Sequence, residues 1–236
     1  MTSSRPAVLF DIDGTLIDSN YFHTVAWWRA LRDAGEDIAM SRIHHLIGMG
    51  SDQLLQELLG EEREGLADAH AGHYAPYKPL LRAFPGASDL LEAVDKRGAQ
   101  VVLATSSKQE DLDELLEKLD ADDTIDEIVH GDMVEASKPA PDIFAVAMDK
   151  LDLAPERTLV VGDTRWDIEA ASEIGLDVVT VLTGGWTRHD LEGRRGGRQA
   201  PVSQTGTERQ EERAPAGRRP AGRRPAGRPR CDGTPG

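Results

Sequence analysis

Residues 8–18 read VLFDIDGTLID, an apolar run that ends in two aspartates one residue apart, followed by a glycine. The apolar residues predict a short buried strand. Asp11 and Asp13 would then stand side by side at its end, although buried carboxylates are costly unless they are paired or bind a metal ion. Packing gives no reason for two like charges here, so the pair indicates a chemical role.

The apolar runs and the helical patterns between them predict the fold. Apolar residues dominate positions 7–10, 100–104, 158–161 and 177–182, with a weaker run at 127–130. Helical patterns lie at 88–97, 109–119, 141–151 and 166–174. Strands that alternate with helices of about ten residues favour the α/β class, with a doubly wound (Rossmann-like) parallel sheet as its core. Ligands bind at the carboxyl ends of the strands in such sheets.

Residues 18–82 interrupt this alternation. They contain no convincing strand, and their helical stretches lie at 20–34, 41–46, 51–59 and 61–74. Phe84, Pro85 and Gly86 mark the return to the sheet. We therefore expect a core formed by residues 1–17 and 83–193, with an inserted all-helical cap, residues 18–82, over the strand ends.

The net charge of the chain, −15, divides unevenly along it. Residues 194–236 contain 11 Lys and Arg and 4 Asp and Glu, a net of +7, which leaves −22 for residues 1–193. Residues 218–230 read RRPAGRRPAGRPR, and this composition predicts a disordered basic tail. Apolar patterning stops abruptly before residue 194, which would also fit a frame-shifted sequence. Both origins of the tail stay open.

The charge distribution also bears on partners. An acidic body repels nucleic acid, so a nucleic-acid-binding or interaction protein would have to act through the tail alone. No apolar run approaches the ~20 residues of a membrane span, and residues 1–5 lack the apolar stretch of a signal peptide. The single cysteine, Cys231, fits a reducing compartment. We expect a cytoplasmic protein that binds neither membranes nor, through its body, nucleic acid; its oligomeric state stays open.

Polar residues follow the other predicted strands as well. Asp163 and Asp167 lie beyond the run at 158–161, Thr105 and Ser106 end the run at 100–104, and Lys138 precedes the helix at 141–151. Because the carboxyl ends of parallel strands meet at one edge, these residues should converge with Asp11 and Asp13. Four carboxylates in one cleft require cations, and carboxylate oxygens without His or Cys suit Mg²⁺. With a lysine and a hydroxyl, this set meets the needs of a phosphoryl group.

These residues also carry a family resemblance. DIDGT at 11–15, Thr105, Lys138 and GDTRWD at 162–167 resemble, in order and spacing, the four motifs of the haloacid dehalogenase (HAD) superfamily of phosphohydrolases. The helical insert is similar to the type I cap of that superfamily. The resemblance covers about residues 7–192, and it is greatest to phosphoglycolate phosphatases and beta-phosphoglucomutases.

The resemblance implies a mechanism. Asp11 would attack phosphorus to form an aspartyl-phosphate, and Asp13 would protonate the leaving alcohol and then deprotonate the hydrolytic water. Mg²⁺ would be held by the Asp11 carboxylate, the Asp13 main-chain carbonyl and Asp163. Asp167 would either join the metal or support the residues that hold it. The phosphoryl oxygens would be bound by Thr105, Ser106 and Lys138.

Within the superfamily, Asp13 favours a phosphoester substrate, because dehalogenases lack an acid/base carboxylate at this position. Phosphonatases add a Schiff-base lysine in the cap, whereas Lys78, the only lysine of residues 18–82, lies close to the return to the sheet. The sequence therefore favours a Mg²⁺-dependent phosphatase acting on a small phosphorylated organic molecule. Phosphoglycolate, a sugar phosphate and a nucleotide all stay open as substrates.

A phosphomutase is the alternative. Residues 18–28, DSNYFHTVAWW, resemble the first cap helix of beta-phosphoglucomutase, including His23, which we expect to act in cap closure or substrate contact. However, the loop GMGSD at 48–52 has no Arg where such mutases bind a second phosphate. Of the other aromatic and imidazole residues in the cap, we expect Trp27 and Trp28 in its core, and solvated positions for His44, His45, His70 and His73.

Overall fold

The computed structural model describes residues 5–192, apart from the Asp122 side chain, and these residues belong to one compact unit. The predicted basic tail, residues 194–236, and the nucleic-acid interpretation that depends on it lie outside the described residues. Within the described part of the chain, no helix combines the length and the apolar character needed to cross a bilayer.

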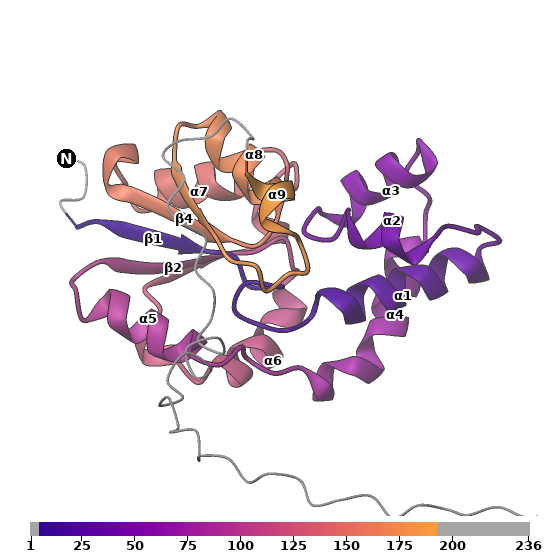
Figure 1. Ribbon diagram of the computed structural model, residues 1–236, viewed down its shortest axis with the longest axis horizontal. Coiled ribbons are helices and arrows are strands. Elements are labelled where there is room, and N and C mark those ends of the chain that lie inside the picture. Colours follow the sequence, from indigo (N-terminus) through magenta and orange to yellow (C-terminus); the bar gives the residue numbers. More distant parts are fainter. Residues whose placement is uncertain (1–4, 193–236) are drawn as a thin grey trace, which may run out of the picture. The chain divides into compact units, whose positions relative to one another are not determined.

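Five parallel strands form the central sheet (Figure 1). They are β1 (Ala7–Phe10), β2 (Gln100–Ala104), β3 (Glu127–Val129), β4 (Thr158–Gly162) and β5 (Asp177–Thr180), in the spatial order β3-β2-β1-β4-β5. β1 lies at the centre, with Phe10 opposite Leu103 of β2 and Val161 of β4. The predicted doubly wound α/β fold is confirmed. β3 and β5 end one and two residues earlier than predicted, at the two edges of the sheet.

Helices cover both faces of the sheet, α5 and α6 on one and α7 and α8 on the other (Figure 1). Their bounds are Ala87–Asp95 (α5), Gln109–Leu119 (α6), Asp142–Lys150 (α7), Arg165–Glu173 (α8) and Arg188–Leu191 (α9). Short 3₁₀ turns occupy Asp122–Thr124 (η2), Gly131–Met133 (η3) and Pro155–Arg157 (η4). α6, α7 and α8 each connect one parallel strand to the next, and α5 leads into β2. These four helices cover the apolar faces of the sheet.

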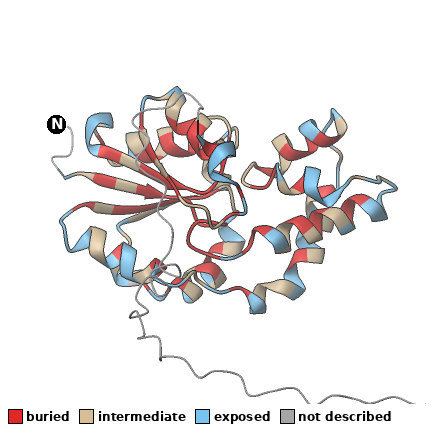
Figure 2. Cartoon of the chain, in the orientation of Figure 1, coloured by how far each residue is buried: buried red, intermediate tan, exposed pale blue. Residues whose placement is uncertain are grey.

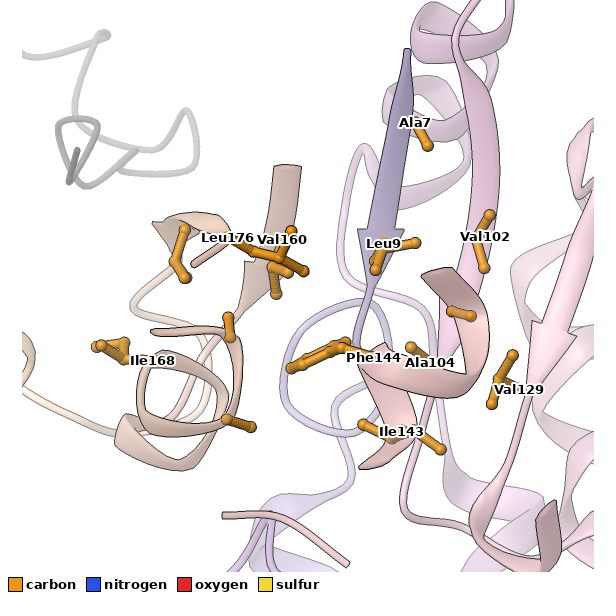
Figure 3. Packing of buried hydrophobic residues seen from close by; sticks show 14 of the residues in the cluster. Ala7, Leu9, Val102, Ala104, Val129, Ile143, Phe144, Val160, Ile168 and Leu176 are labelled. Atoms are coloured by element: carbon orange, nitrogen blue, oxygen red, sulfur yellow. The ribbon is translucent and has the colours of Figure 1, made fainter. Parts of the chain in front are cut away.

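The side chains of each strand alternate between the two covered faces, which is why the strands read as continuous apolar runs. Leu9 and Val102 pack with Phe144 of α7, as Figure 3 shows, whereas Phe10 and Leu103 pack toward α5 and α6. β1, β2 and β4 are accordingly buried along most of their length, whereas the edge strands β3 and β5 are partly exposed (Figure 2).

Between β1 and α5 the chain forms helices only, beyond the carboxyl end of β1 (Figure 1). They are α1 (Asn20–Asp33), α2 (Met40–His44), α3 (Ser51–Leu59), α4 (Leu66–Tyr74) and the 3₁₀ helix η1 (Ala75–Leu80). α4 begins five residues later than predicted, after Gly65, whose φ of +81° lies in the left-handed region. The division of the chain into a core and a cap domain at residues 17/18 and 82/83 stays a prediction.

The helical segment has an apolar cluster of its own, which includes Trp27, Leu31, Ile43 and Leu54. Trp27 is buried in the cluster, as predicted, whereas Trp28 is only partly buried and packs against it. Trp166 of α8 is buried in the same cluster, although it belongs to the sheet's own helices. The cluster therefore joins the helical segment to α8.

The packing in Figure 3 predicts the effect of truncating Leu9, which is fully buried. Leu9→Ala should lower the free energy of unfolding by about 2 to 5 kcal/mol, because it removes apolar contacts and leaves a cavity between β1 and α7. Urea denaturation measures this change. Leu90→Ala on α5, where Leu90 is 42% exposed, should change stability by less than ~0.5 kcal/mol. Equal effects of the two substitutions would contradict the packing described.

Candidate active site

The turn after β1 brings its polar residues to the strand end. The Asp11 N–H donates to the Val161 carbonyl at 2.9 Å, which continues the pairing of β1 with β4 by one residue. Gly14 then turns the chain with a φ of +78°. A Cβ at Gly14 would lie 2.4 Å from Asp163 Oδ2, so only glycine permits this close approach. Gly14 therefore lets the side chain of Asp163 pack directly against the turn after β1.

Lys138 lies at the centre of the site with 1% of its side chain exposed. Its ammonium group forms ion pairs with Asp11 Oδ1 at 2.6 Å and Asp167 Oδ1 at 2.8 Å, and it donates to the Ala104 carbonyl at 3.3 Å. Burial alone would lower the pKa of Lys138, but the two carboxylates raise it above its usual range. Lys138 is therefore a permanent cation.

Asp163 and Asp167 follow β4 and are both buried. Thr15 Oγ1 donates to Asp163 Oδ1 at 3.0 Å, and Asn20 Nδ2 donates to Asp163 Oδ2 at 2.8 Å. Asp167 belongs to the capping box of α8, in which Thr164 Oγ1 donates to Asp167 Oδ2 at 2.6 Å. One Asp167 oxygen thus caps the helix while the other faces Lys138.

Carboxylate oxygens of Asp11, Asp163 and Asp167 lie within 4.8 Å of one another. Burial raises the pKa of Asp11 to about 7, with further contributions from Asp167 and Asp13 that Lys138 opposes. Burial, then the charges of Asp11 and Asp167, raise the pKa of Asp163 well above its usual range. These shifts mark a site with more negative charge than Lys138 neutralises. The all-oxygen donor set fits a hard divalent cation such as Mg²⁺.

The Asp13 side chain lies apart from this cluster. It accepts hydrogen bonds from Ser19 Oγ at 2.6 Å and Ser107 Oγ at 2.7 Å, and His23 Nε2 lies 3.3 Å from Asp13 Oδ1. Burial acts to raise the pKa of Asp13, but His23 and the two serines outweigh it and lower this pKa below its usual range. The two aspartates of the motif therefore differ in their surroundings. The contact of the Asp13 main-chain carbonyl with a metal stays a prediction.

His23 belongs to a stack of rings beside Asp13. Its ring lies 3.9 Å from that of Tyr74, and its Nδ1 lies 3.3 Å from His70 Nε2. His70 in turn stacks on Trp27 at 4.3 Å, and burial lowers the pKa of His70 well below its usual value of 6.5. The prediction of a solvated position is wrong for His70, because these aromatic neighbours exclude water from most of its ring.

A cavity of about 110 Å³ lies between the strand ends and the helical segment. Asp11, Asp13, Thr105 and Ser106 line it, and Ser106 Oγ donates to the Gly48 carbonyl at 3.4 Å. His23 lines it as well, whereas Lys138, Asp163 and Asp167 are buried and do not line it. The structure thus brings every predicted site residue to one end of the sheet. Some of these residues line the cavity, and the others lie buried behind it.

The sequence analysis missed four residues that hold the aspartates in place. Thr15 and Asn20 contact the clustered carboxylates, and Ser19 and Ser107 contact Asp13. Thr15 belongs to the DIDGT motif, so a position near Asp11 follows from the sequence. Ser107 directly follows Ser106, but its contact with Asp13 spans 94 positions of the chain. The orientation of Ser19 and Asn20 depends on how α1 leaves the turn, and no local pattern indicates it.

Known proteins resemble this chain over most of its length. The family model described as haloacid dehalogenase-like hydrolase matches residues 8–181. A phosphorylated carbohydrates phosphatase of Thermotoga maritima is 29% identical over 178 residues, which cover 72% of this chain and 82% of that protein. A phosphoglycolate phosphatase of Aquifex aeolicus is 31% identical over 181 residues, with coverage of 75% and 84%. The crystal structure of a hydrolase from Pseudomonas syringae is 34% identical, with a TM-score of 0.77 and coverage of 84% and 94%.

The environment of His70 predicts a pH dependence of stability. The pKa of His70 is well below 6.5 in the folded protein, so the unfolded chain binds a proton at this residue more readily. Stability should therefore fall as the pH drops below about 6.5. His70→Gln removes this contribution, so the variant should lose less free energy of unfolding than the wild type between about pH 7.5 and pH 5. Urea denaturation at both pH values measures the difference, and an equal or larger loss in the variant would contradict the prediction.

Proposed function

This chain belongs to the haloacid dehalogenase-like hydrolase family, and on that basis we propose that it is a Mg²⁺-dependent phosphatase that hydrolyses a small phosphoester through an aspartyl-phosphate on Asp11. One observation carries the proposal above the others. A carboxylate paired with the buried Lys138 lines the same cavity as a second carboxylate, that of Asp13, which has hydrogen-bond partners of its own.

Asp11 suits the part of the nucleophile. Lys138 holds Oδ1 at 2.6 Å, and Thr15 Oγ1 approaches Oδ2 at 3.2 Å, so the carboxylate has a fixed direction. A carboxylate needs no separate base, and a phosphoenzyme divides one difficult step into two. In the first step an Asp11 oxygen bonds to phosphorus while the bond from phosphorus to the substrate oxygen breaks. In the second, water attacks that phosphorus and Asp11 is released with inorganic phosphate.

Asp13 suits the proton transfers of both steps. It would give a proton to the departing alcohol oxygen and later take one from the attacking water. Ser19 and Ser107 hold its two oxygens, which keeps the carboxyl group in one orientation through the cycle. The approach of a phosphate dianion raises the proton affinity of a neighbouring carboxylate, which favours the acid form when the substrate binds.

We assign the remaining residues to binding. Asp11, Asp163 and the Asp13 main-chain carbonyl would hold Mg²⁺, which when bound would neutralise negative charge on the phosphoryl group. Asp167 would position Lys138, since Lys138 and Thr164 already engage its two oxygens. Thr105 and Ser106, which line the cavity, would bind phosphoryl oxygens. Lys138, which contacts Asp11 Oδ1 from its buried position, would bind a phosphoryl oxygen next to that contact.

The phosphomutase alternative is less well supported. Gly48, Met49, Gly50 and Ser51 of the GMGSD loop line the cavity. In the described part of the chain no arginine or lysine from residues 18–82 lines it. A mutase must hold a second phosphate away from the reacting one, and an anion of that charge requires cationic partners.

Removing either aspartate of the pair tests the roles proposed for them. Asp11→Asn should abolish turnover and phosphoenzyme formation, because an amide is a far weaker nucleophile. Release of phosphate from small phosphoesters measures turnover, and a rate within about tenfold of wild type would exclude Asp11 from the role. Asp13→Asn should be nearly inactive on ordinary esters. With p-nitrophenyl phosphate, whose leaving group needs no proton, rapid-quench sampling should detect an accumulated aspartyl-phosphate.

The metal requirement gives a further test. Chelation should remove activity and Mg²⁺ should restore it, whereas Ca²⁺ should inhibit, because its larger and looser coordination shell disturbs the in-line geometry. Asp163→Ala should raise the Mg²⁺ concentration required, as measured by calorimetric titration and by activity. The exposed Asp190 serves as the control, and Asp190→Ala should leave the requirement unchanged. Turnover that resists chelation would point to another mechanism.

A further inference from the structure

The wall that the helical segment gives to the cavity is mostly apolar, with His23 and His70 as its ionisable side chains. From the helical segment it is lined by Trp27, Ile47, Met49, Leu54, Ala67 and Ala71, together with the glycines and Ser51 of the 48–51 loop. The group attached to the phosphate must lie against this wall when the phosphoryl group reaches Asp11. Its chemistry therefore determines which phosphoesters the site accepts.

The cations of the helical segment are used elsewhere. Arg29 is exposed and does not line the cavity. The other five do not line the cavity either, and each has a partner. The pairs are Arg32 with Asp37, Arg42 with the Glu57 carbonyl, Arg63 with Glu36, Lys78 with Asp111 of the cavity lining, and Arg82 with the carbonyls of Pro79 and Leu81. None of them remains for a negative charge on the substrate.

The two histidines of the wall are not free to pair with a substrate anion either. Both ring nitrogens of His23 are engaged, Nε2 with Asp13 and Nδ1 with His70. His70 is stacked on Trp27, and burial keeps its pKa well below 6.5, so its ring is neutral. Neither ring is therefore available as a counter-ion for the substrate.

Two sources of positive charge lie beside the cavity, Lys108 and the N-terminus of α3, and each has an acidic residue next to it. Lys108 is the one lysine or arginine among the described residues that line the cavity; it is exposed, and Glu110 and Asp111 line the cavity next to it. The N-terminus of α3 begins at Ser51, where a Cβ on Gly50 would lie 2.6 Å from Asp52 Oδ1. An acid in the first turn offsets the partial positive charge of a helix N-terminus.

From these contacts we propose that the cavity selects phosphate monoesters of neutral, hydroxylated alcohols and discriminates against esters whose leaving group carries a second negative charge, such as phosphoglycolate. The inference rests on the proposed phosphatase function. A carboxylate placed against Trp27, Met49 and Leu54 would lose its water without gaining a cationic partner. It would also lie near the charges of Asp11 and Asp13, whereas a hydroxyl group would meet only hydrogen-bonding and apolar groups.

Two matched pairs of substrates test this selectivity. The first compares 2-hydroxyethyl phosphate with phosphoglycolate, which has a carboxylate where the former has a hydroxymethyl group. The second compares glycerol 3-phosphate with 3-phosphoglycerate. The pair that is hydrolysed faster decides the test. In that pair and in the presence of Mg²⁺, kcat/KM should be at least about tenfold higher for the neutral ester than for the carboxylate ester. Equal values, or a preference for the carboxylate, would overturn the inference and leave the phosphatase function standing. Absence of hydrolysis of both pairs and of p-nitrophenyl phosphate would refute the function, and the inference with it.

A cation added to the wall should shift the selectivity. Met49→Lys places an ammonium group in the cavity and should raise kcat/KM for phosphoglycolate relative to 2-hydroxyethyl phosphate by about tenfold. Met40→Lys is the matched control, since Met40 is 39% exposed on α2 and does not line the cavity. It should leave the ratio unchanged. Ser51→Lys, at a second lining position, replaces the test variant if thermal unfolding shows that Met49→Lys is not folded. An unchanged ratio in a folded lining variant would contradict the proposal.

Discussion

The buried ammonium group of Lys138 is the charge on which the arrangement of the site depends. It lies between Asp11, after β1, and Asp167 on α8, and all three side chains are buried. A buried charge is tolerated only where opposite charges and hydrogen bonds compensate it, and each partner here would be strongly destabilising if left alone. The two ion pairs therefore hold three segments, distant in sequence, at one point beneath the cavity. The nucleophile proposed for this site has its direction fixed by the same contacts.

Lys138 does not neutralise all the carboxylates around it, and the helix cap of α8 holds one of them, that of Asp167, in place. Asp167 gives one oxygen to Thr164 in the capping box and the other to Lys138. A local rule of helix termination thus places a carboxylate where the site needs it. The spacing between Asp163 and Asp167 follows from this geometry, because Asp163 ends the strand region and Asp167 is the third residue of the helix.

The sequence predicted those parts of the fold and the site that local patterns encode. The bounds of β2 and α6 agree with the predicted ones. Asp11 and Asp163 follow strands, and Lys138 lies in the connection after β3, so all three lie at the carboxyl end of the parallel sheet. Contacts between distant segments were not predictable in this way. Ser107 reaches Asp13 across 94 positions of the chain, and the burial of His70 depends on rings from another helix. Single-sequence periodicity contains no information on either contact.

The start of α1 links the helical segment to the chemistry of the strand ends. Ser19 holds Asp13, and Asn20, the first residue of α1, holds Asp163 and also approaches the Gly184 carbonyl. On the other side, Trp166, between the two aspartates of GDTRWD, packs into the apolar cluster of the helical segment. A rotation of α1 away from the sheet would break the first contacts and expose Trp166. The apolar wall of the cavity and the orientation of the carboxylates therefore depend on the same packing. The leaving-group selection that we propose and the positioning of the reacting groups would accordingly be physically linked.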